Sequence, residues 1–334
     1  MTPHRFLVLD GMRGIAAFAV LWVHAGYGFG TAFYPRHGYL AVDFFFALSG
    51  FVVAHAYEAR IASGLGFGAF ARVRLIRLYP MLFAGAVLGA LAYDPGWRAG
   101  GGTLALLNVS VFLVLPLGLL LDMSAFPVNT PIWSLFFELA ANATYWATAR
   151  RPRRDVAKAL IFLVATGVVL AVIAAMVGGL RAVGVASPWA FLAGIPRTGF
   201  SYAVGVLMFR YRLHERAPQV PDFIVALALA VLLAVPACGW WYDMVCVLLA
   251  FPLLLALGAQ AWEMPGLNAV WGWCGALSYP VYVIHEPLLR AVYRLHGPYL
   301  LSMVLAIAAA WALLRWYDEP LRRSLARRRA PAPG

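Results

Sequence analysis

The stretch AKALIFLVATGVVLAVIAAMVG, residues 157–178, decides the class of fold, because it is long and apolar enough to cross a lipid bilayer. An α-helix needs about 20 mostly apolar residues to span the hydrocarbon core. Outward from this stretch, comparable apolar segments recur along the chain, at 6–28, 39–57, 77–93, 103–121, 131–148, 190–210, 222–237, 241–258, 271–291 and 299–317. The sequence therefore predicts an all-α fold, a polytopic bundle of membrane helices.

The composition supports a membrane protein and excludes an ordinary soluble domain. Of the 334 residues, 63% are hydrophobic and 12% are charged, whereas a soluble domain carries about a quarter charged residues. The net charge of +12 could suggest a nucleic-acid partner, but the Lys and Arg residues stand in short loops between apolar segments. That placement is typical of the positive-inside rule. We therefore expect the lipid bilayer as a partner and no nucleic acid.

The three cysteines, Cys238, Cys246 and Cys274, lie inside or beside apolar segments. They form no CxxC motif and stand at no Cys/His spacing typical of a metal site. We interpret them as packing residues, and we expect neither a disulfide framework nor a bound metal.

The basic loops limit the number of membrane crossings. Loops 58–76, 149–156 and 211–221 and the C-terminal tail are rich in Arg and Lys, so all of them should lie in the cytoplasm. An even number of crossings must then separate loop 58–76 from loop 149–156, although three apolar segments lie between them. One of these three segments should therefore not cross.

Segment 103–121 is the best candidate for a re-entrant segment, because glycines occupy 100–102 and Pro116 interrupts it. Such a segment is tolerated where protein buries it. The remaining segments then give about ten transmembrane helices, with both termini in the cytoplasm. We expect a membrane domain over 1–321 and a basic cytoplasmic tail over 322–334.

Ionisable residues inside membrane helices are costly and usually functional. The spacing from Arg13 to His24 brings both to one face of the first helix, about 16 Å apart along its axis. Asp43, near the start of the second segment, should lie at the depth of His24. A carboxylate bonded to one ring nitrogen leaves the other nitrogen basic, as a general base requires. A structural pair that joins the two helices is an equally good interpretation.

Two further polar stripes are expected at the same depth. One follows Trp133 and consists of Ser134, Glu138 and Asn142. The other, near the end of the chain, consists of Ser278, Tyr282 and His285. Several polar stripes that converge at one depth indicate a cavity in the outer half of the bundle.

Arginines form a separate group where the third segment begins. Arg74 and Arg77 lie one helical turn apart and could clamp a phosphate group. Arg72 beside them is better explained by topology and lipid headgroups. Arg197 is a further intramembrane charge, which either lines the cavity or forms a structural pair.

Five stretches match a known family in the order in which that family has them. They are LDGMRGIAAFAVLWVH (9–24), GYLAVDFFFALSGFV (38–52), RLIRLYP (74–80), PIWSLFFELAAN (131–142) and LSYPVYVIHEPLL (277–289). With them, the chain resembles the membrane-bound acyltransferase-3 family, which O-acylates bacterial cell-surface glycans and some small molecules. Arg13 and His24 have the family's Arg-x10-His spacing, and residues 74–77 match its Arg-x-x-Arg motif. After Glu138, the chain lacks the second acidic residue and the Gln of many relatives.

The resemblance implies about ten helices in the bacterial cytoplasmic membrane, a cytoplasmic acyl-CoA donor and an acceptor hydroxyl on the other side. It also implies an essential His24 assisted by Asp43. The acceptor would be a glycan or a related molecule. We expect acyl-CoA, most simply acetyl-CoA, as a co-substrate and no permanently bound cofactor.

The expected mechanism combines these groups along one path. Arg74 and Arg77 would hold the CoA phosphates, with Arg13 and Asp10 further along. His24 would take the proton of the acceptor hydroxyl as that oxygen attacks the thioester. The acceptor side, or the site that stabilises the oxyanion, would be lined by His285, Trp133, Ser134 and Glu138.

Two other classes of function use similar residues. A proton-coupled transporter of a small solute or an acyl donor also carries intramembrane His, Asp, Glu and Arg, although no inverted repeat is evident. A glycan-binding scaffold would hold a ligand without chemistry. Consumption of acyl-CoA that depends on His24 separates the enzyme from both, whereas uptake of a labelled solute would favour the transporter.

Overall fold

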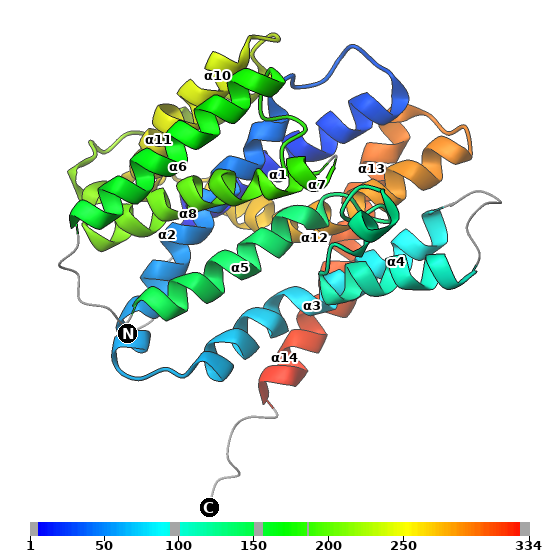
Figure 1. Ribbon diagram of the computed structural model, residues 1–334, viewed down its shortest axis with the longest axis horizontal. Coiled ribbons are helices and arrows are strands. Elements are labelled where there is room, and N and C mark those ends of the chain that lie inside the picture. The colour runs from blue at the N-terminus through cyan, green and yellow to red at the C-terminus, as the bar shows by residue number, and fades with distance from the viewer. Residues whose placement is uncertain (1–5, 94–100, 150–155, 186, 328–334) are drawn as a thin grey trace, which may run out of the picture.

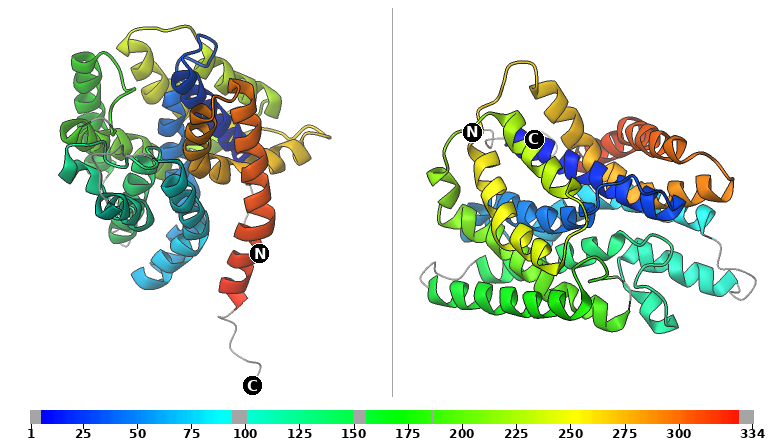
Figure 2. Two further views of the ribbon diagram at one scale, coloured as in Figure 1. Left: turned by 90° about the vertical axis from the view of Figure 1, so that its right-hand side faces the viewer. Right: turned by 90° about the horizontal axis from the view of Figure 1, so that it is seen from above.

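The computed structural model describes residues 6–93, 101–149, 156–185 and 187–327, and these residues form a helical bundle without a strand (Figure 1). Its helices are α1 (Leu7–Phe29), α2 (Ala41–Ala62), α3 (Phe67–Ala92), α4 (Gly101–Leu113), α5 (Ile132–Ala149), α6 (Val156–Val177), α7 (Pro188–Leu192), α8 (Gly194–Arg210), α9 (Asp222–Ala234), α10 (Trp240–Val245), α11 (Phe251–Gln260), α12 (Asn268–Arg294), α13 (Tyr299–Leu313) and α14 (Glu319–Arg327). Turns of π-helix join α10 to α11 and α13 to α14. The last pair forms one rod that extends beyond the bundle (Figure 2).

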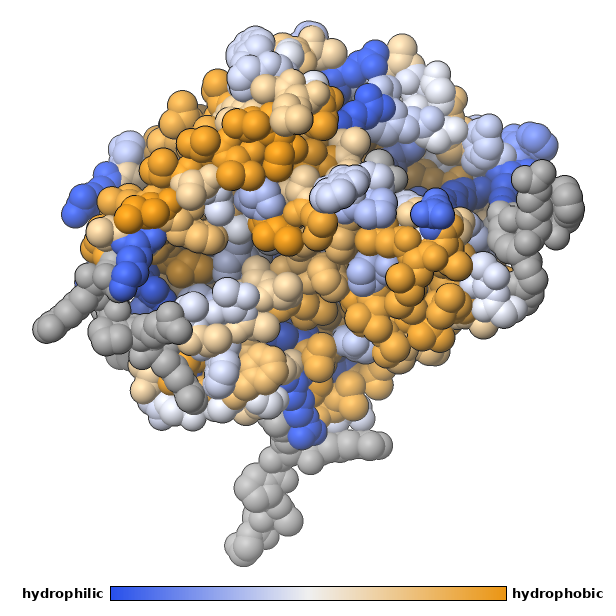
Figure 3. All heavy atoms as spheres, viewed as in Figure 1, coloured by the Kyte–Doolittle hydropathy of each residue, from blue (hydrophilic) through white to orange (hydrophobic). Residues whose placement is uncertain are grey.

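The outer surface of the bundle suits a lipid environment. Six helices in the described residues are long and apolar enough to cross a membrane. Helix α6 exposes large apolar side chains such as Leu160, Ile161 and Val164. Figure 3 shows broad hydrophobic areas over the bundle, with hydrophilic side chains gathered toward its ends. The predicted class, an all-α polytopic membrane bundle, is confirmed, and the count of about ten crossings stays a prediction.

Close helix pairs form the centre of the bundle. A side-chain carbon on Gly50 would collide with the backbone of Tyr202, and one on Gly205 with the backbone of Ala47. Helices α2 and α8 therefore pack backbone to backbone, as small residues permit in membrane proteins. Gly14 meets α12 in the same way, which joins α1 to α12. These two pairs carry half of the predicted site residues, namely Asp10, Arg13, His24, Asp43 and His285.

As predicted, the segment 103–121 does not form a single membrane-spanning helix. Helix α4 is 13 residues long, about 20 Å, which is shorter than the hydrocarbon core. Phe112 at its end packs on Tyr79 and Phe83, in the middle of α3. Val114 then turns the chain with a φ of 54°, and it continues through a short 3-10 helix. A short helix followed by a turn is compatible with the predicted re-entrant segment, which itself stays a prediction.

The described helix ends that border the basic loops lie at one end of the bundle. Glu58, near the end of α2, accepts hydrogen bonds from Tyr145 of α5 and Arg210 of α8. The indole of Trp146 donates to the carbonyl of Leu65, just before α3, over 3.0 Å. The ends of the helices that border these loops therefore meet, as the charge pattern predicts. The predicted tail boundary at 322 falls inside α14, and residues 328–334 lie outside the described residues.

Candidate active site

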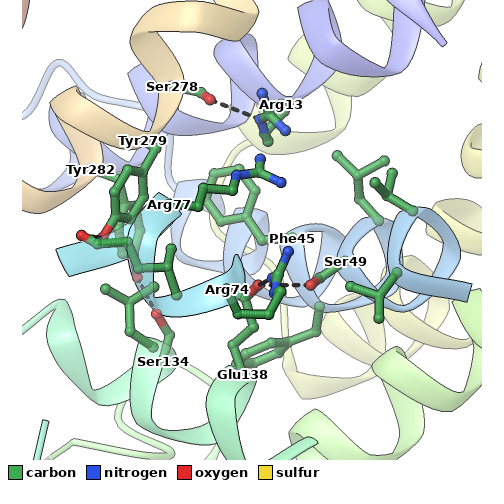
Figure 4. Close-up of a pocket in the computed structure, with 16 residues that line it drawn as sticks. Arg13, Phe45, Ser49, Arg74, Arg77, Ser134, Glu138, Ser278, Tyr279 and Tyr282 are labelled. Atoms are coloured by element: carbon green, nitrogen blue, oxygen red, sulfur yellow. Dashed lines mark hydrogen bonds and ion pairs between the residues drawn. The ribbon is translucent and has the colours of Figure 1, made fainter. Parts of the chain in front are cut away.

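Helices α1, α2, α3, α5 and α12 enclose a cavity, here called the arginine pocket (Figure 4). It contains about 760 Å³ of atom-free space, part of it open to the surroundings. Its polar lining consists of Arg13, Ser49, Arg74, Arg77, Ser134, Glu138, Ser278, Tyr279 and Tyr282. Apolar side chains, among them Phe45, Val52 and Leu135, complete its walls. Charged and apolar side chains therefore line the same pocket.

Two of the three arginines in the pocket are anchored by the protein. Arg13 donates to Ser278 over 2.8 Å and to the carbonyl of Gly275 over 2.9 Å, and it lies 3.1 Å from Asp10. Arg74 donates to Glu138 over 2.8 Å. Asp10 thus acts as a counter-ion for Arg13 and is not itself among the residues that line the cavity.

Arg77 has no such anchor. It lines the same cavity but forms no hydrogen bond or ion pair with any residue that the structure describes. Arg13 and Arg74 lie close enough to act on its charge. Three guanidinium groups thus share two carboxylates, those of Asp10 and Glu138. The excess positive charge suits an anionic ligand.

Glu138 is predicted to line the acceptor side with His285; in the structure it pairs with Arg74, and its role toward the acceptor stays a prediction. Its carboxylate accepts from both Arg74 and Ser49 over 2.8 Å, inside the arginine pocket. Arg74 can reach Glu138 from within a helix because α3 begins at Phe67, well before the expected start at residue 77. Arg74 is therefore a buried residue inside a helix and not part of a loop.

A pair of hydroxyl groups lies at the deep end of the pocket. The hydroxyls of Ser134 and Tyr282 are 2.7 Å apart, so one donates to the other, and the carbonyl of Pro131 lies 3.1 and 3.2 Å from them as a further acceptor. Tyr282 was placed only in a polar stripe by the sequence. In the structure its ring centroid is 6.0 Å from that of His285. Tyr282 therefore joins the arginine pocket to the histidines.

His24 and His285 form a hydrogen-bonded pair, whose tautomers follow from their partners. Nδ1 of His285 lies 3.0 Å from the carbonyl of Val281, which only accepts, so Nδ1 carries the proton. Nε2 of His285 must then accept, and Nδ1 of His24 donates to it over 2.8 Å. Nε2 of His24 is thus left with a free lone pair. This is the form of imidazole that a general base requires.

The predicted pair of His24 and Asp43 does not form. Both oxygens of Asp43 accept from Arg197, over 2.9 and 2.6 Å, and His285 takes the expected place beside His24. Arg197 is 1% exposed and also donates to the carbonyls of Leu180 and Val183. A bidentate guanidinium satisfies the carboxylate more fully than one imidazole nitrogen. The structure therefore shows the alternative that the sequence left open for Arg197, a structural pair.

Trp133 lies outside the arginine pocket. The guanidinium of Arg197 stands 5.4 Å above its ring, and Phe46 packs on it edge to face. Gly184, at a φ of 102°, lies so close to the ring that no side chain would fit. Trp133 thus supports the loop between α6 and α7.

Comparison with known proteins points to one family. A family model described as an acyltransferase domain matches residues 6–315. The chain is also 38% identical over 193 residues to protein 2 in the picA locus of Rhizobium radiobacter, a match that covers 52% of this chain and 96% of that protein. No solved structure matches. The chain belongs to the membrane-bound acyltransferase-3 family and is an acyltransferase of a membrane.

Proposed function

We propose that the protein transfers an acyl group from cytoplasmic acyl-CoA to a hydroxyl of a glycan or related acceptor on the other side of the cytoplasmic membrane. One observation carries this proposal: the arginine pocket, with its unanchored Arg77, reaches Tyr282 at the edge of the histidine pair. The arginines that would bind an anionic donor thus line a cavity that extends to Tyr282, beside the pair of His24 and His285.

The donor would enter at the arginines. Its phosphates would bind Arg77 first, because the forks of Arg13 and Arg74 are already partly occupied. The pantetheine arm would lie along apolar residues such as Phe45 and Leu135. An extended arm of this kind matches the distance of about 16 Å between Arg13 and His24 along α1. The thioester would then stand near Ser134 and the histidine pair.

The chemical step would use the free nitrogen of His24. Nε2 takes the proton of the acceptor hydroxyl while the oxygen attacks the thioester carbonyl. The tetrahedral intermediate then collapses, the C–S bond breaks, and the CoA sulfur takes the proton back from Nε2. His285 accepts from Nδ1 of His24 throughout, so it positions the imidazole. The hydroxyl of Tyr282 or Ser134 is close enough to this region to donate to the oxyanion.

Arg77 variants test the donor site. Arg77→Ala should raise the KM for acetyl-CoA about tenfold or more with a smaller effect on kcat, because it removes a charge-assisted contact to the bound donor. Arg77→Lys should restore only part of the affinity, since it offers a point charge in place of a fork. The measurement is acyl transfer by purified protein in proteoliposomes, combined with direct binding of CoA.

Arg72→Ala is the matched control, because Arg72 lies on the same helix, is exposed and does not line the pocket. It should leave both constants unchanged. Normal CoA binding by Arg77→Ala and by the double variant with Arg74→Ala would show that these arginines serve topology alone.

A further inference from the structure

A second group of arginines lies at the opposite end of α1 from the arginine pocket. Here the guanidinium of Arg181 stands 3.7 Å from the ring centroid of Tyr27. The rings of Tyr27 and Tyr34 meet edge to face with centroids 4.9 Å apart. Arg36 donates to the hydroxyl of Tyr34 over 2.7 Å and stands over its ring. We call these four residues the tyrosine–arginine cluster.

The cluster carries two positive charges that the protein does not neutralise. Neither Arg36 nor Arg181 forms an ion pair with a carboxylate in the described part of the chain. Both act electrostatically on Tyr27, so they converge on the same pair of rings. Asp243, the carboxylate that contacts the loop of Arg181, is 1% exposed and accepts from Tyr39 and from the backbone of Leu180. It therefore faces the interior.

The buried ion pair described above fixes the loop that presents Arg181. Arg197 binds the carbonyls of Leu180 and Val183 on either side of it, over 2.9 and 2.8 Å. Asp243 binds the amide of Leu180 over 2.8 Å. Arg181 itself is exposed. An exposed cation on a loop held at three backbone atoms is preorganised for a ligand, so little ordering entropy is lost on binding.

Tyr27 of the cluster lies close to His24, the proposed general base. Tyr27 follows His24 by three positions on α1, which places it about 4.5 Å further along the axis and within about 60° of the same face. Arg13 lies in the other direction along this helix. The cluster therefore lies on the side of His24 away from the arginine pocket, where the proposed acceptor would approach.

We infer that the tyrosine–arginine cluster binds a carboxylate or phosphate group of the acceptor, and that the acceptor is an anionic glycan. This inference rests on the proposed function. The two guanidiniums offer charge-assisted hydrogen bonds to the anionic group, which selects an acidic sugar over a neutral one. A lipid headgroup phosphate shares this chemistry, but the cluster's position one turn from His24 favours the acceptor.

Glycan binding without acyl-CoA tests the inference separately from acyl transfer. The probes are a glucuronic-acid oligosaccharide and a neutral glucose oligosaccharide of equal length, with the protein in phosphatidylcholine nanodiscs. The acidic probe should bind at least about tenfold more tightly, and the double variant Arg36→Gln/Arg181→Gln should remove that preference. Arg216→Gln, an exposed arginine at the basic end, should leave the preference unchanged.

Three results would overturn the inference. The first is equal binding of both oligosaccharides, and the second is an unchanged preference in the double variant. The third is loss of the arginine-dependent binding when phosphatidylglycerol is added to the nanodiscs, which would assign the cluster to lipid headgroups. Failure of the proposed function would appear elsewhere, as normal CoA binding by the Arg77 variants.

Discussion

Replacing His24 with alanine should lower kcat for acyl transfer by about 10²- to 10⁴-fold, the usual contribution of a general base. Nε2 of His24 is the nitrogen left free by the hydrogen-bonded pair with His285. The variant removes one hydrogen bond, the one to His285, so the folded state should lose little stability. The measurement is turnover of acetyl-CoA by purified protein in proteoliposomes, with CoA binding as a check that the donor site is intact.

His285→Leu is the informative companion to this variant. Without His285, the Nδ1 proton of His24 loses its acceptor, so activity should fall by a smaller factor and the pH profile of kcat should change. A merely structural His285 would lower the amount of folded protein and leave the pH profile of the remainder unchanged. If His24→Ala keeps more than about a tenth of the wild-type rate, the general-base role is wrong.

Replacing Asp43 with alanine should destabilise the protein by about 3–5 kcal/mol, because it leaves the guanidinium of Arg197 buried without its counter-ion. The effect should appear as a lower Tm in detergent. The exposed pair of Arg212 and Glu215 offers a control, and Glu215→Ala should leave Tm unchanged. Asp43→Ala with normal Tm and strongly reduced kcat would instead support the direct role beside His24 that the sequence suggests.

Hydropathy predicted the helices well because each crossing must be apolar over most of its length. The prediction of a re-entrant segment followed from the even number of crossings that must separate two cytoplasmic loops, together with Pro116 and the glycines at 100–102. Helix α3 was less well predicted, since charged residues such as Arg72 and Arg77 lower the hydropathy of its first turns. The structure begins this helix at Phe67.

The sequence indicated several residues of the candidate site but not their pairing. Arg13, Arg77 and Ser134 were each predicted as site residues, and all three line one pocket. Spacing fixes the position of a residue along its own helix, but not which neighbouring helix it faces. For that reason Asp43 was assigned to His24, although Arg197 approaches from α8 and binds it.

The sidedness of acyl transfer is the most direct test of the mechanism, because the proposed donor and acceptor sites lie at opposite ends of the bundle. Sealed proteoliposomes would contain protein of one orientation, with the three native cysteines replaced by alanine. Labelling of Phe33→Cys or Arg216→Cys, exposed residues at opposite ends, would report that orientation. Product should form only when acetyl-CoA is on the Arg216 side and the acceptor on the Phe33 side. Transfer at the full rate with both substrates on the Phe33 side would contradict the account.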